Sequence, residues 1–93
     1  DFVILLSHNP DYAERLITRD IDLMLSGHTH GGQVTLFGLW AAAVPSAYGQ
    51  KYRGGFVRTE HTLVYVTTGV GTITPPVRFW ARPEVVLITL ERR

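Results

Sequence analysis

Residues 2–32, FVILLSHNPDYAERLITRDIDLMLSGHTHGG, decide how the chain is expected to fold. The stretch opens on a continuous apolar run at residues 2–6, and a second apolar run follows at residues 21–25. Short continuous runs of this kind are typical of strands that are buried on both faces of an α/β sheet. The sequence therefore predicts two buried strands, and the segment between them has to connect them.

The connecting segment carries the signals of a helix. Asn9 can cap its first turn, Pro10 suits the first helical position, and Asp11 favours the positive end of the helix dipole. Apolar residues then recur at helical spacing until about Arg19, and Asp20 ends the predicted helix. The predicted order is strand, helix, strand, which indicates an α/β fold.

The rest of the chain is expected to be β-rich with little helix. The expected elements are a short strand at 33–37, an apolar loop at 38–50, a hairpin with strands at 55–59 and 62–68, a loop rich in glycine, threonine and proline at 69–76, and a last strand at 84–90.

Composition narrows the possible functions. The chain has 93 residues, 45% hydrophobic and 18% charged, which is typical of one globular domain at most and excludes disorder. The net charge is only +1 and no basic patch is visible, so no nucleic-acid partner is expected. Because there is no cysteine, any metal site must use imidazole, carboxylate or amide ligands.

The beginning of the chain suggests that it belongs to something longer. The first residue is Asp1 rather than methionine, and a strand-like run follows almost at once. We find no signal peptide and no segment long enough to span a bilayer. The sequence leaves open whether the protein works in the cytoplasm or in association with a membrane.

The string GHTHGG at residues 27–32 is the sharpest local feature. In an extended backbone, residues two apart point to the same side, so His28 and His30 are predicted to reach one metal or two adjacent metals. Gly27, Gly31 and Gly32 are expected to shape the turn, because glycine permits positive φ and a close approach to the backbone.

His8 supplies a third imidazole. It follows the first predicted strand, and ligand sites in open α/β sheets lie outside the carboxyl ends of strands. Three neutral imidazoles suit Zn, Mn, Fe or Ni better than Mg or Ca. Taken alone, His8 is equally compatible with an ordinary polar residue at a strand end, and His61, at the hairpin turn, is expected to be an ordinary histidine.

Two of these strings together carry a family resemblance. SHNPD at residues 7–11, followed by SGHTHGGQ at 26–33, resembles the last two metal motifs of the calcineurin-like metallophosphoesterases, in particular their bacterial phosphodiesterase-like branch. The strings GVGT at 69–72, PVRF at 76–79 and RPE at 82–84 resemble the same branch. The resemblance covers nearly the whole chain.

The resemblance implies a fold and an activity. The fold would be part of a four-layer α/β/β/α sandwich with mixed β-sheets. The activity would be hydrolysis of a phosphomonoester or phosphodiester substrate by in-line attack at a dinuclear centre of two divalent metal ions, with Mn, Fe or Zn favoured. In this scheme His8 and His28 would bind the second metal and His30 the first.

The family's earlier motifs are missing. The sequence has no Asp-x-His, no Gly-Asp-x-x-Asp and no Gly-Asn-His, and Asp11 and Asp22 are poor substitutes for the bridging carboxylate. Residues 1–93 are therefore predicted to be the C-terminal portion of a metallophosphoesterase domain. We identify no catalytic residue beyond the metal ligands, and we expect weak metal binding and no useful turnover from this chain alone.

Other partners stay open. A non-catalytic metal-binding or self-associating fragment is the alternative to an enzyme. The apolar stretch from Leu36 to Pro45 is expected to pack on the missing N-terminal half, with contact to a lipid or a membrane surface as the other possibility. Arg53, Arg58 and Arg78 could bind phosphate, although each is equally compatible with a solvated strand residue, and Arg78 is the candidate substrate-binding residue.

Overall fold

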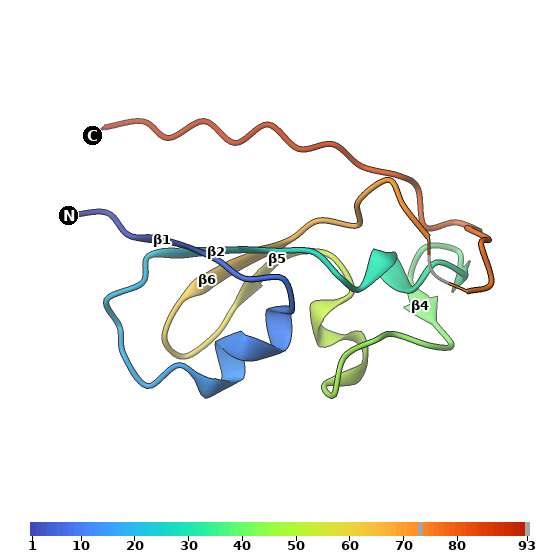
Figure 1. Ribbon diagram of the computed structural model, residues 1–93, viewed down its shortest axis with the longest axis horizontal. Helices are drawn as coiled ribbons and strands as arrows, with labels where there is room; N and C mark the ends of the chain where they lie inside the picture. Colours follow the sequence, from blue (N-terminus) through green and yellow to red (C-terminus); the bar gives the residue numbers. More distant parts are fainter. Residues whose placement is uncertain (73, 93) are drawn as a thin grey trace.

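A four-stranded mixed sheet lies at the centre of the computed structural model, which describes residues 1–72 and 74–92. The strand order is β1-β2-β6-β5; β1, β2 and β6 are parallel, and β5 is antiparallel to β6 (Figure 1). The hairpin and the two N-terminal strands are confirmed, with shorter bounds than predicted. These bounds are β1 (Ile4–Leu6), β2 (Leu23–Ser26), β5 (Gly55–Arg58) and β6 (Leu63–Val66).

The helical elements are all 3₁₀ helices, namely η1 (Pro10–Arg15), η2 (His30–Gly32) and η3 (Gly49–Tyr52). A second, two-stranded sheet pairs β3 (Thr35–Leu36) with β4 (Trp40–Ala41), so the predicted strand at 33–37 is shorter and the predicted loop at 38–50 contains a strand. The described residues contain no α-helix. Strand–helix–strand order is therefore found, with a 3₁₀ helix as the connection.

The prediction that the first helix continues to Arg19 is wrong. Asn9 caps it and Pro10 opens it as expected, but the backbone of Leu16 is already extended, with φ −66° and ψ 127°. The consequence is that the last apolar residue of the predicted helix does not join its buried face. Leu16 is buried, whereas Ile17, which helical spacing places beside Ala13, is 94% exposed.

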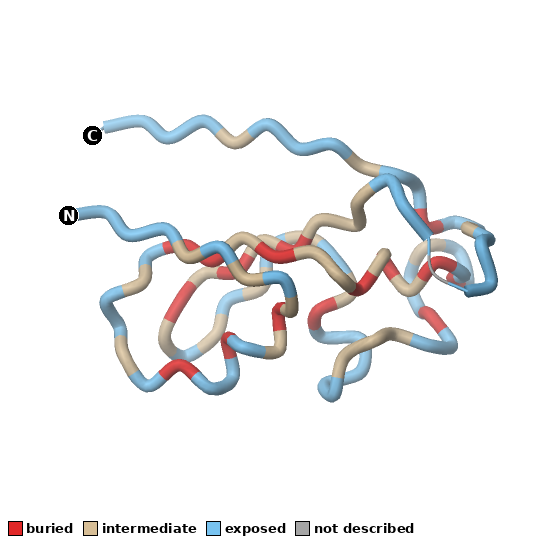
Figure 2. Tube along the Cα trace, in the orientation of Figure 1, coloured by how far each residue is buried: buried red, intermediate tan, exposed pale blue. Residues whose placement is uncertain are grey.

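The core lies on one face of the sheet. Alternate residues of a strand point to opposite faces of a sheet. Leu5, Met24, Val64 and Val57 are aligned across the four strands, so their side chains lie on the same face, the one covered by η1 and η3. The buried cluster consists of Ala13, Met24, Tyr52, Val64 and Val66, with Leu5 and Val57 packed against it. Figure 2 shows that buried stretches occur both in the strands of the sheet and in the helical segments beneath it.

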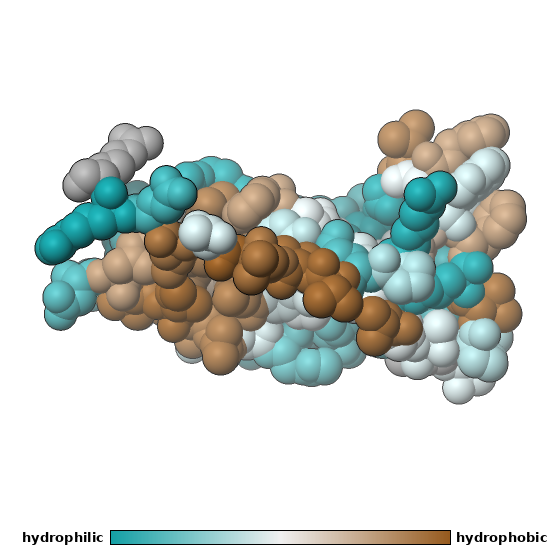
Figure 3. All heavy atoms as spheres, turned by 90° about the horizontal axis from the view of Figure 1, so that it is seen from above, coloured by the Kyte–Doolittle hydropathy of each residue, from teal (hydrophilic) through white to brown (hydrophobic). Residues whose placement is uncertain are grey.

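The opposite face of the sheet is apolar and largely open. Leu6 is 75% exposed and Phe56 is 63% exposed, so β1 is not buried on both faces as the sequence predicted. The reason is that β1 is an edge strand and that only one side of the sheet carries helical segments. Seen from the other side, apolar surface runs along much of the length of the molecule (Figure 3), and the C-terminal segment that passes over this face contributes to it.

The predicted last strand at 84–90 is also wrong. This segment is extended and runs back across the open face toward the end of the molecule where the N-terminus lies (Figure 1), but it joins no sheet. Val85 is 90% exposed and Leu87 is 93% exposed. A strand needs a partner for its backbone donors and acceptors. Among the described residues, the only backbone–backbone hydrogen bond of this segment runs from Glu84 N–H to Gly69 C=O at 2.8 Å.

The loop predicted at 69–76 is found, apart from Ile73, which lies outside the described residues. No helix in the part of the chain that the structure describes is long and apolar enough to cross a bilayer.

Candidate metal centre

The carboxyl ends of β1 and β2 bring His8 and His28 together. The two strands are parallel neighbours, so the residues that follow them emerge at the same edge of the sheet. Ser26 Oγ donates to Ser7 C=O at 2.7 Å, and Gly27 N–H donates to His8 C=O at 3.3 Å, which fastens the two emerging segments to each other. The ring centroids of His8 and His28 are 4.6 Å apart, with an interplanar angle of 54°.

The backbone of the second motif is not extended, so the predicted alternation is wrong. His28 and His30 have φ of 71° and 51°, and Thr29 between them is right-handed helical, with φ −76° and ψ −12°. A tight turn of this kind separates the two imidazoles: His28 pairs with His8, and His30 contacts the loop after β6. Positive φ is uncommon for residues other than glycine, and such strain is concentrated at functional sites.

His30 is held by one backbone carbonyl. Its Nδ1 lies 3.2 Å from Gly71 C=O. A carbonyl oxygen can only accept, so Nδ1 is the donor in this contact, and in the neutral form of such a ring Nε2 is the nitrogen that keeps a lone pair. This is the arrangement that metal-ligating histidines ordinarily use.

Arg78 holds the same carbonyl. Its Nε and Nη2 donate to Gly71 C=O at 2.9 and 2.7 Å, and Nη2 also donates to Thr68 C=O at 2.6 Å. Nη1 donates to Ala81 and Arg82 C=O at 2.9 and 3.5 Å. The guanidinium is thus directed at the backbone of its own loop, and substrate binding by Arg78 would require these bonds to open.

Two of the three predicted turn glycines are required by geometry. Gly31 and Gly32 have φ of +62° and +76°, and a Cβ at Gly32 would lie 2.3 Å from Ala41 Cβ. A Cβ at Gly27 would meet only Thr67 Cγ2, at an ordinary 3.7 Å. The turn therefore requires glycine at positions 31 and 32, whereas position 27 could carry a larger residue.

The histidines fit part of a metal site. Among the described residues, no group of three or more His, Asp or Glu side chains is close enough to hold an ion. The adjacent rings of His8 and His28 can supply two nitrogen ligands, and His30 stands apart with its Nε2 available. A tetrahedral site needs four ligands, so the described residues supply an incomplete set.

A cavity of about 370 Å³ opens beside His8. Its wall includes Tyr12, Arg15 and Tyr48, three residues that the sequence analysis missed. Tyr12 and Arg15 are three positions apart in the helical segment after His8, which is a signal that could have been noticed. Tyr48 could not have been found, because only the tertiary fold brings it to η1.

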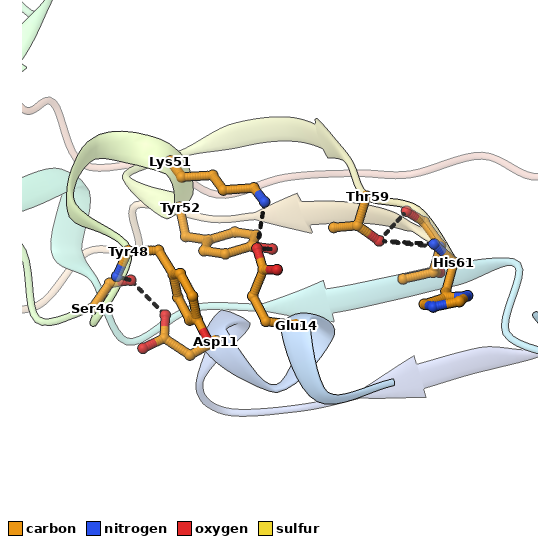
Figure 4. A network of polar contacts seen from close by, with 9 residues as sticks. Asp11, Glu14, Ser46, Tyr48, Lys51, Tyr52, Thr59 and His61 are labelled. Carbon is orange, nitrogen blue, oxygen red and sulfur yellow. Dashed lines mark hydrogen bonds and ion pairs between the residues drawn. The ribbon is translucent and has the colours of Figure 1, made fainter. Parts of the chain in front are cut away.

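Polar contacts fix the far wall of this cavity (Figure 4). Asp11 accepts from Ser46 Oγ and, at 2.8 Å, from Ala47 N–H. Figure 4 shows the Tyr48 ring pointing from the same loop toward η1. These contacts attach the loop before η3 to the helical segment that follows His8, so both sides of the cavity are held in place by hydrogen bonds.

A second set of contacts is centred on Glu14. Its carboxylate accepts from Lys51 Nζ and, at 2.6 Å, from Tyr52 Oη. The hydrogen bond from Lys51, followed by that from Tyr52, lowers the pKa of Glu14 below its ordinary value of 4.5. Burial, followed by the Glu14 carboxylate, raises the pKa of the Tyr52 phenol. Glu14 is therefore ionised at neutral pH and ties η1 to η3.

Known proteins of three organisms illustrate what the chain resembles. It is 41% identical over 90 residues to a protein of Bacillus subtilis named uncharacterized metallophosphoesterase YkuE, an alignment that covers 97% of the chain and 31% of that relative. It is 39% identical over 89 residues to phosphodiesterase YaeI of Escherichia coli, covering 94% of the chain and 32% of the relative. A zebrafish transmembrane protein with metallophosphoesterase domain is 38% identical over 92 residues, covering 97% of the chain and 20% of the relative.

No family model and no solved structure matches the chain. The chain spans a third or less of the length of each of these three relatives, in their C-terminal part. The similarity nevertheless extends over nearly all of its residues and recurs across bacteria and an animal. The chain belongs to the metallophosphoesterase family, of whose longer members it corresponds to the C-terminal part.

Proposed function

We propose that this chain contributes histidine ligands to a dinuclear metal centre that hydrolyses phosphomonoesters or phosphodiesters. The observation that carries the proposal is the His8–His28 ring pair at the carboxyl edge of two adjacent parallel strands, with centroids 4.6 Å apart. Family membership supports the reaction class, and the printed name of the Escherichia coli relative is phosphodiesterase.

The proposed roles follow the separation of the imidazoles. His8 and His28 would share one divalent ion, and His30 would ligate the other through Nε2, because its Nδ1 is occupied by Gly71 C=O. Imidazole ligands favour Mn, Fe or Zn over Mg or Ca. When bound, a divalent pair supplies Lewis-acid stabilisation of the charge that develops on the phosphoryl group.

The chain's own residues would bind and orient the substrate. The cavity beside His8 can receive part of a phosphoester, with Arg15 and the Tyr12 and Tyr48 phenols on its wall as donors to an anionic oxygen. No carboxylate among the described residues joins the histidines, so the remaining ligands would come from another segment. The isolated chain should therefore bind metal weakly and turn over no substrate.

The test is a chimaera that supplies the other segment. The 89 matched residues of the Escherichia coli relative are replaced by this chain, and hydrolysis of bis(p-nitrophenyl) phosphate is measured with added Mn²⁺. We expect metal-dependent hydrolysis, reduced by about 100-fold or more in His28→Ala, because loss of a ligand removes Lewis-acid stabilisation.

His61→Ala is the matched control. His61 lies in the turn before β6, at the edge of the sheet opposite His8 and His28, because β6 runs parallel to β2. The control chimaera should keep its activity. A folded chimaera without activity, or equal losses in His28→Ala and His61→Ala, would contradict the proposed function.

The stretch from Leu36 to Pro45 supports a second proposal, contact with an apolar surface. Leu36, Phe37, Leu39 and Trp40 are each more than half exposed. Packing on another segment, such as the part of the longer relatives that this chain does not match, and contact with lipid would both use this exposure. Co-sedimentation of the chimaera with phospholipid vesicles decides between them: binding that is lost in Leu39→Glu supports lipid contact, and no binding supports packing on protein.

A further inference from the structure

Gly71 C=O is the meeting point of three donors. Arg78 Nε and Nη2 approach it at 2.9 and 2.7 Å, and His30 Nδ1 approaches it at 3.2 Å. A carbonyl oxygen has two lone pairs, and hydrogen bonds from a charged donor are the stronger ones. The guanidinium therefore determines where this oxygen lies, and the oxygen determines how the His30 ring is held.

The other donors of Arg78 fix the loop at both of its ends. Thr68 lies where the chain has just left β6, and Ala81 lies where the chain turns into the C-terminal segment; their carbonyls accept at 2.6 and 2.9 Å. The same two residues pack on the histidine turn, since a Cβ at Gly31 would lie 3.0 Å from Thr68 Cγ2 and 3.5 Å from Ala81 Cβ. The Arg78 side chain thus holds both ends of the loop after β6 together, next to the turn that carries His30.

We propose that Arg78 is a positioning residue for His30. Through Gly71 C=O it holds the imidazole in the Nδ1–H tautomer and so presents Nε2 to a metal ion. This inference rests on the proposed function. It replaces the direct substrate contact expected for Arg78 with a role that acts through the backbone.

An arginine is required for this arrangement. The planar guanidinium carries five N–H donors in a fixed fork, so it can grip Gly71 C=O along one edge while reaching Thr68 and Ala81 with the others. A lysine ammonium is a single point charge and cannot hold three separated carbonyls at fixed angles. Without the hydrogen bonds from Arg78, Gly71 C=O is no longer held beside His30. A neutral imidazole in water favours the tautomer with its proton on Nε2, and this proton blocks the nitrogen that would bind the metal.

The experiment reads the tautomer directly. The metal-free 93-residue chain is labelled with ¹⁵N, and two-bond ¹H–¹⁵N correlations of its four histidine rings are recorded for wild type, Arg78→Lys and the matched control Arg58→Lys. We expect the Nδ1–H tautomer for His30 in wild type and in Arg58→Lys, and a shift toward Nε2–H in Arg78→Lys. His8, His28 and His61 should not change.

A second readout is the affinity of the chimaera described above for Zn²⁺, because the chimaera supplies the further ligands that His30 lacks in the isolated chain. Loss of an outer partner of a metal-ligating histidine ordinarily weakens binding by about 10–100-fold, and we expect a loss in this range for Arg78→Lys and none for Arg58→Lys. An Nε2–H ring in wild-type His30 overturns the proposal even if Arg78→Lys fails to fold. An unchanged tautomer in a folded Arg78→Lys chain also overturns it. A wild-type chain with the Nδ1–H ring that binds no metal contradicts the proposed function alone.

Discussion

Single residues decide what the histidine motif can do. The sequence predicts that His8 and His28 follow two neighbouring strands, and the structure places them there. Alternation in an extended backbone is the wrong geometry, because His28 and His30 both have positive φ. Periodicity describes a regular backbone and cannot detect a left-handed turn. It also cannot show that Gly71, forty-one residues after His30, supplies the hydrogen-bond partner of that ring.

The turn glycines give a prediction with an internal control. Gly32→Ala should lower the free energy of unfolding by about 3 kcal/mol, because it combines a strained positive φ with overpacking against a fully buried Ala41. Gly27→Ala should change it by less than about 1 kcal/mol, since the new Cβ makes an ordinary contact. Urea unfolding of both variants checks this, and equal destabilisation would show that the turn differs from the one described.

At the scale of elements, short segments depend on tertiary contacts. The cap at Asn9 and the opening at Pro10 were predictable from local chemistry, but the end of η1 at Arg15 was not. Its last turn is held by the contacts of Glu14 with Lys51 and Tyr52. These partners are more than thirty residues away in sequence, so no local pattern shows them.

The contact between η1 and η3 should make stability depend on acidic pH. Because folding lowers the pKa of Glu14, its ionised form stabilises the fold above the ordinary value of 4.5, and this contribution is lost as pH falls through the folded pKa. Glu14→Gln should therefore cost about 1 kcal/mol at pH 7 and progressively less below pH 4.5. Thermal unfolding across this pH range measures the difference.

Glu60→Gln is the control for that series. Glu60 pairs with Arg19 at 3.9 Å between side chains that are 78% and 71% exposed, and exposed pairs contribute little. The control should differ from wild type by at most a few tenths of a kcal/mol at every pH. A Glu14→Gln difference that does not shrink in acid would mean that the carboxylate charge is not what ties η1 to η3.

At the scale of the whole molecule, one face of the sheet is covered and the other is open. The two apolar runs near the N-terminus form strands, as predicted, because β2 pairs with both β1 and β6. The last apolar run was read in the same way and forms no strand. Apolar, β-branched composition indicates that a segment suits a sheet, but a strand also requires a partner, and composition does not say whether one is present.

Hydrogen exchange should show this division directly. Backbone amides at 85–92 should exchange at nearly the rate of an unfolded chain, because among the described residues Glu84 N–H is the last backbone donor in the chain with a carbonyl partner. Amides of Met24 and Val64, in paired strands with buried side chains, should exchange slowest. Equal protection at 85–90 and 63–66 would mean that the C-terminal segment has found a strand partner, from a second copy or from elsewhere.

The most direct test of the central claim, that paired histidines at the strand ends hold a metal, is the stoichiometry of Mn²⁺ and Zn²⁺ bound to the metal-free chain. Wild type and His61→Ala should bind weakly and alike, since the ligand set is incomplete but present in both. His8→Ala should lose this binding, because it leaves His28 without the neighbour whose ring lies 4.6 Å away. Binding that survives in His8→Ala, or that is absent from the wild-type chain, would contradict the account.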